Sequence, residues 1–104
     1  MNYLKPIVAF DVDNTLITSE GEPRNAVIQL FSLLQRFGCK MIIWSNGTDG
    51  TLSGVEYAKK VRDQLCLDAE VVEKGSLQPD ITVDDLGMLD RISESTLGKV
   101  NIRV

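Results

Sequence analysis

The chain has 104 residues, of which 43% are hydrophobic and 25% are charged, and its formal net charge is −4. This length allows one domain around one core, so we expect a single domain over residues 1–104. The acidic balance argues against the basic surface that strong nucleic-acid binding needs, and the absence of histidine excludes His-containing zinc sites and Ser-His-Asp triads. No apolar run is long enough to span a bilayer and the N-terminus lacks a signal-peptide pattern, so we expect a cytoplasmic protein without membrane partners.

Short buried strands alternate with amphipathic helices along the chain. Strands are predicted at residues 7–10, 40–44, 71–72, 81–83 and 100–104, where short apolar runs occur. A helix is predicted at 25–37, because apolar residues recur there at helical spacing and Gly38 follows as a stop. A second helix is predicted at 53–66 with Ser53 as its N-cap, and a weaker helical turn at 86–95. The alternation predicts a three-layer, Rossmann-like α/β fold, with helices on both faces of a parallel sheet.

Polar residues follow three of the predicted strands directly. Asp11 and Asp13 follow the first strand, Ser45 follows the second, and Asp84 with Asp85 follows the fourth. The carboxyl ends of parallel strands share one edge of the sheet, so these side chains are expected to converge there. If the strand order reverses at strand 7–10, strands 40–44 and 81–83 flank it and a crevice opens at the reversal.

The residue types at this edge predict a divalent cation and a phosphate group. Several carboxylates without histidine or arginine among them repel one another unless a cation compensates. Mg²⁺ prefers oxygen ligands and often bridges carboxylates to a substrate phosphate. The loop that begins Ser45-Asn46-Gly47 offers a hydroxyl and backbone N–H groups, which suit phosphate oxygens.

These motifs resemble those of the haloacid dehalogenase superfamily. Residues 11–16, DVDNTL after an apolar strand, resemble its first motif, hhhhDxDxT. Residues 42–47, IIWSNG, resemble the second motif, and residues 81–85, ITVDD, resemble the fourth. Lys74 lies where the third motif supplies a lysine, and the resemblance spans residues 7–85.

The resemblance implies a phosphatase that works through a covalent intermediate. Asp11 would attack phosphorus to form an aspartyl-phosphate, and Asp13 would act as the general acid and then the general base. Ser45 would hydrogen-bond the phosphoryl oxygens together with Asn46 and Gly47, and Lys74 would neutralise charge on the nucleophile and the phosphate. A solvent-facing Lys74 before the turn at Gly75 is the structural alternative.

The resemblance also implies how the metal is held and what covers the site. Mg²⁺ would be bound by Asp11, the backbone carbonyl of Asp13 and Asp84, with Asp85 in support. Residues 17–24 and 73–79 lie where the family inserts cap domains, and neither stretch is long enough to form one. The resemblance is therefore to the capless branch, whose sites take phosphate groups of small molecules or macromolecular ends, or are covered by a second subunit in a homo-oligomer.

Two other functions compete with the phosphatase. One is a non-catalytic regulatory module of the same fold that binds phosphate or metal without turnover. The other is a receiver domain, which carries its phosphorylated aspartate after the third strand. No aspartate directly follows Val72 in this chain, so the receiver domain is disfavoured.

Overall fold

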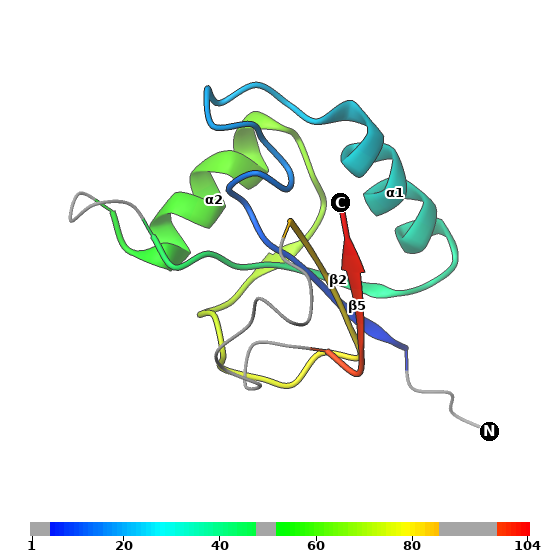
Figure 1. The fold of residues 1–104 in the computed structure, drawn as a ribbon. Coiled ribbons are helices and arrows are strands. Elements are labelled where there is room, and N and C mark those ends of the chain that lie inside the picture. Colours follow the sequence, from blue (N-terminus) through cyan, green and yellow to red (C-terminus); the bar gives the residue numbers. More distant parts are fainter. Residues whose placement is uncertain (1–4, 48–51, 86–97) are drawn as a thin grey trace.

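The computed structural model describes residues 5–47, 52–85 and 98–104. From β1 to β3, strands and helices alternate as the sequence predicts (Figure 1). In chain order the elements are β1 (Ile7–Phe10), α1 (Asn25–Arg36), β2 (Lys40–Ile43), α2 (Gly54–Gln64), β3 (Glu70–Val71), β4 (Ile81–Asp84) and β5 (Val100–Arg103). The predicted helical turn at 86–95 lies outside the described residues.

The five strands form one parallel sheet in the order β3-β2-β1-β4-β5. The α/β class and the parallel sheet are therefore confirmed. The chain moves outward from β1 to β3 and then returns to place β4 on the other side of β1. This reversal puts the carboxyl ends of β1 and β4 side by side at a topological switch point, where open α/β sheets bind ligands.

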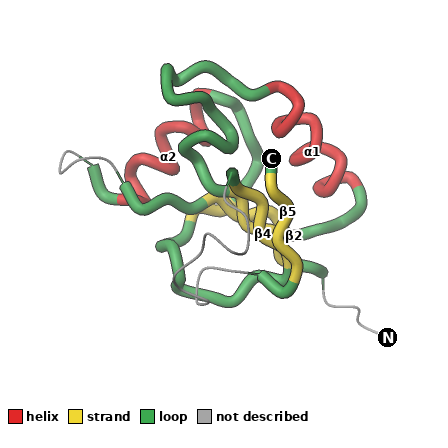
Figure 2. Tube along the Cα trace, in the orientation of Figure 1, coloured by secondary structure: helices red, strands yellow, loops and turns green. Residues whose placement is uncertain are grey.

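Both described helices cover the same face of the sheet (Figure 2). Val27 and Phe31 of α1, and Ala58 and Val61 of α2, pack in one core with the residues of β1 and β2 that point to that face. Phe31 meets Phe10 edge to face, with ring centroids 5.2 Å apart. Right-handed crossovers explain this arrangement, because β1 to β2 and β2 to β3 both step in the same direction along the sheet.

The opposite face differs from the expected helical layer within the described residues. Ala9, Ile42 and Trp44 are buried there against a smaller cluster that includes Val72 and Leu77 from the segment between β3 and β4. That segment contains no helix in the structure. Loop residues, rather than a crossover helix, therefore cover this part of the sheet.

Most element boundaries differ from the predicted ones by one or two residues. The Ser53 side chain caps α2, since its Oγ accepts a hydrogen bond from the Glu56 backbone N–H at 3.1 Å. β4 extends one residue beyond its apolar run and so includes Asp84. Neither described helix is long and apolar enough to cross a bilayer.

The connection between β1 and α1 is held by more hydrogen bonds than we expect for a short polar connection. Leu16 and Ile17 donate backbone hydrogen bonds to Val12 O, which turns the chain immediately after β1. Ile17 then bridges Pro23 in antiparallel fashion, and the Arg24 guanidinium donates to Asn14 O at 2.6 Å. These bonds fix the path of the loop that carries Asp13.

Candidate functional site

Asp11 stands at the carboxyl end of β1, where the sheet pairing fixes its position. Its backbone N–H donates to Val83 O at 3.1 Å, which continues the β1–β4 pairing one residue past Phe10. Its Oδ1 accepts from the Val12 backbone N–H at 3.0 Å, and its Oδ2 lies 3.6 Å from Lys74 Nζ. The carboxylate is thus held by its own loop on one side and by a cation on the other.

Lys74 reaches this carboxylate from the segment after β3. Its side chain is 11% exposed and the Asp11 side chain 17%, so solvent screens this ion pair less than an exposed one. Lys74 is therefore not the solvent-facing lysine of the alternative interpretation. The structure brings together the residues predicted as nucleophile and neutralising cation, although their roles remain predictions.

Asp84 lies beside Asp11 at the end of the neighbouring strand. Because Phe10 pairs with Val83, continuing the register by one residue places Asp11 opposite Asp84, about 4.8 Å away between backbones. Asp84 is 1% exposed, whereas Asp85, just past the strand, is partly exposed. A buried carboxylate is costly unless neighbouring groups offset its charge, and Asp84 is the predicted metal-binding residue that the fold removes furthest from solvent.

Asp13 is exposed, and a tyrosine from α2 holds its carboxylate. The Tyr57 hydroxyl donates to Asp13 Oδ1 at 2.6 Å. Burial first, and then the Asp13 and Asp11 carboxylates, raise the pKa of Tyr57 to about 12. Tyr57 therefore remains a proton donor throughout the neutral range. From sequence, Tyr57 is only part of the inner stripe of the second helix, and no local signal marks it as a site residue.

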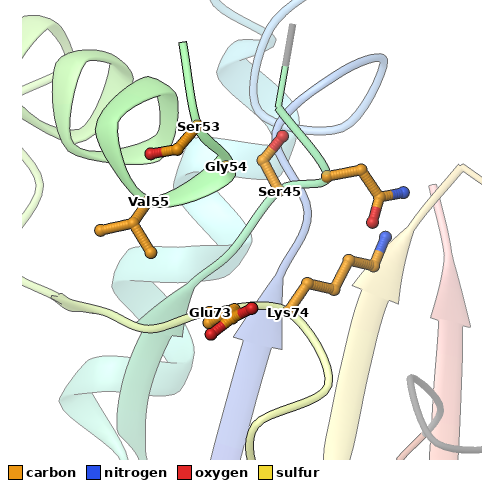
Figure 3. A pocket seen from close by; sticks show the side chains of 7 residues that line it. Ser45, Ser53, Gly54, Val55, Glu73 and Lys74 are labelled. Carbon is orange, nitrogen blue, oxygen red and sulfur yellow. The ribbon is translucent and has the colours of Figure 1, made fainter. Parts of the chain in front are cut away.

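Ser45 and Asn46 line a pocket of about 370 Å³ next to Lys74 (Figure 3). Ser45 is buried two residues past the end of β2, and its Oγ accepts a hydrogen bond from the Gly47 backbone N–H at 3.2 Å. The loop predicted to bind phosphate therefore lies on the same side of the sheet edge as Lys74. The remaining lining residues are Ser53, Gly54, Val55 and Glu73.

Gly54 lets the first turn of α2 approach this loop closely. A Cβ atom at Gly54 would overlap the backbone carbonyl oxygen of Ser45. Gly47 has a φ of +99°, and a Cβ there would lie 3.0 Å from Gly54 N. Two glycines thus hold the end of β2 against the start of α2, which fixes the wall of the pocket.

A magnesium ion would find oxygen donors here, but not a complete set of side-chain ligands. The described residues contain no group of three acidic, histidine or cysteine side chains that could hold a metal ion. Asp11 and the buried Asp84 are the adjacent pair, and Asp13 already accepts the Tyr57 hydrogen bond. These residues fit Mg²⁺ in the form it often takes, with one or two carboxylates and the remaining ligands from backbone, water or substrate phosphate.

Comparison of the chain with protein-family models, with curated proteins and with solved structures finds no match. The assignment of a function to this site rests on its residues and their geometry.

Proposed function

We propose that this protein is a magnesium-dependent phosphatase that hydrolyses phosphomonoesters through an aspartyl-phosphate on Asp11. The observation that carries the proposal is the shielded Asp11–Lys74 pair at the switch point, beside the buried Asp84. An anionic nucleophile approaches an anionic phosphoryl group only where cations and hydrogen-bond donors offset the repulsion. The resemblance of residues 7–85 to the haloacid dehalogenase superfamily supports the same assignment.

Each residue then has a defined step. Asp11 attacks phosphorus, the ester P–O bond breaks, and Asp13 gives its proton to the leaving oxygen. Asp13 next takes a proton from water, which hydrolyses the aspartyl-phosphate and releases inorganic phosphate. Lys74 and Ser45 bind the phosphoryl oxygens throughout. Mg²⁺, bound by Asp11 and Asp84, would supply further neutralisation of phosphoryl charge.

The test is the Asp11→Asn variant, which keeps the shape of the side chain and removes its nucleophilicity. Hydrolysis of p-nitrophenyl phosphate with Mg²⁺ is expected to fall about a thousandfold or more, as for loss of a covalent nucleophile. Asp63→Asn, on the exposed face of α2, is the matched control and should keep the rate. Mass spectrometry of acid-quenched wild-type protein should find phosphate on Asp11. Turnover that survives Asp11→Asn contradicts the proposal.

A non-catalytic phosphate-binding module is the second candidate. It is favoured by the lack of three grouped metal-binding side chains in the described part of the chain. Such a module would bind inorganic phosphate in a manner that needs Lys74, and would turn over no ester on a broad phosphomonoester panel. The same assays therefore separate the two functions.

A further inference from the structure

We propose that the pocket beside Lys74 holds the carbon skeleton of a small phosphorylated polyol, and that Glu73 selects it by accepting hydrogen bonds from its hydroxyl groups. This inference rests on the proposed function, because it takes the phosphoryl group to lie at Asp11 and Lys74. It adds the class of substrate, which the catalytic residues do not determine.

The size of the pocket favours a small molecule. Its volume of about 370 Å³ lies at the lower end of the range for small-molecule sites, which runs from about 300 to 1,000 Å³. Ser45, Asn46 and Lys74 line it, so the space is continuous with the predicted phosphate-binding residues. A phosphate near Lys74 would leave room in the pocket for a skeleton of a few carbon atoms.

The charges of the lining are divided between neighbouring residues. Lys74 directs its ammonium group to Asp11, as the ion pair shows, whereas the next residue, Glu73, lines the pocket with a carboxylate. In the described part of the chain the Glu73 side chain forms no ion pair or hydrogen bond that would occupy it. Figure 3 shows the Glu73 and Lys74 side chains extending from neighbouring positions of one segment. A ligand bound here would meet a cation near its phosphate and an acceptor farther along its skeleton.

The rest of the lining is also suited to hydroxyl groups. Ser53 Oγ accepts from the Glu56 backbone N–H, so its own proton remains to be donated to a ligand. The Asn46 amide provides both a donor and an acceptor. Val55 is the one larger apolar side chain of the described lining, which has no aromatic residue to stack on a nucleobase. This lining matches a polyol better than a hydrocarbon or a nucleoside.

The experiment compares two ligands that differ only in hydroxyl groups, glycerol 3-phosphate and propyl phosphate. Each is titrated by calorimetry, with Mg²⁺, into the Asp11→Asn protein, in which turnover is blocked. Glycerol 3-phosphate is expected to bind about tenfold or more tightly than propyl phosphate, the effect of hydrogen bonds to a charged acceptor. When Glu73→Ala is added to the Asp11→Asn protein, the ratio of the affinity for glycerol 3-phosphate to that for propyl phosphate should fall to about two or less.

Glu70→Ala is the matched control, because Glu70 is an exposed carboxylate whose partner is the exposed Lys40. The ratio should stay unchanged in that variant. Equal affinities for the two ligands, a preference that survives Glu73→Ala, or no binding of glycerol 3-phosphate up to about 10 mM would overturn the inference. A preference that depends on Glu73 in a protein whose wild type hydrolyses neither ester would instead refute the phosphatase and leave the polyol site standing.

Discussion

Tyr57 links α2 to the loop that carries Asp13 through a side-chain hydrogen bond. Its hydroxyl donates to Asp13 Oδ1 at 2.6 Å, and it belongs to the face of α2 that packs on the core. A hydrogen bond between a neutral donor and a carboxylate is stronger than one between two neutral groups. At the scale of one residue, the rotamer of the exposed Asp13 is therefore determined by a side chain 44 positions away.

We expect the replacement of Tyr57 by Phe to change how the free energy of unfolding depends on pH. The folded state raises the pKa of Tyr57 from 10.0 to about 12, so the protonated phenol stabilises the fold fully below pH 10. That contribution is lost as the pH rises through the window from 10 to about 12. Urea unfolding should therefore show a steeper fall in the free energy of unfolding across this window for wild type than for Tyr57→Phe. Parallel curves for the two proteins would contradict the assignment of the hydrogen bond.

At the scale of the element, the start of α2 is determined by contact rather than by helix propensity. Gly54→Ala would gain up to about 1 kcal/mol of helix propensity in an open position. Here the new Cβ overlaps the Ser45 carbonyl oxygen, and overpacking of this kind costs about 1 to 3 kcal/mol. We expect the cost to exceed the gain, with a lower urea midpoint and weaker phosphate binding.

Lys59→Ala, on the exposed face of the same helix, is the control for an alanine substitution that makes no steric contact. It should change the free energy of unfolding by no more than about 0.5 kcal/mol. If Gly54→Ala unfolds at the same urea concentration as wild type, α2 can move away from the end of β2, and the wall of the pocket is not fixed.

The elements themselves were largely predictable from sequence, because their signals are local. The apolar run of β1 is followed directly by Asp11, and the Ser53 cap begins α2. The strand order meets the condition of a reversal at β1, which places β4 beside it. The placement of both described helices on one face follows from two right-handed crossovers in the same direction and not from any local signal. The Lys74–Asp11 and Tyr57–Asp13 contacts depend on how a loop and a helix pack, and no local pattern encodes that packing.

At the scale of the whole molecule, the distribution of charge sets the conditions for stability. The chain carries a net charge of −4, and Asp11, Asp13, Asp84 and Asp85 lie at or just past the carboxyl ends of β1 and β4, at the same edge of the sheet. Lys74 compensates Asp11, the member of this group to which it is paired. A cation that binds this edge in the folded state, and not in the unfolded chain, should therefore stabilise the entire domain.

Thermal unfolding with and without Mg²⁺ tests this coupling between the site and the fold. Binding to the folded state alone adds about 2.7 kcal/mol at a free Mg²⁺ concentration one hundred times its Kd, so the Tm should rise with Mg²⁺. Asp84→Asn replaces the buried predicted ligand with a neutral amide and should remove most of that rise. Asp68 is an exposed carboxylate next to Ala69, and the Asp68→Asn variant should keep the rise of Tm with Mg²⁺.

Because salt alone screens repulsion between exposed charges, NaCl at equal ionic strength is the reference. An equal rise of Tm with NaCl and Mg²⁺, or a full rise in Asp84→Asn, would show that no specific cation site joins β1 to β4.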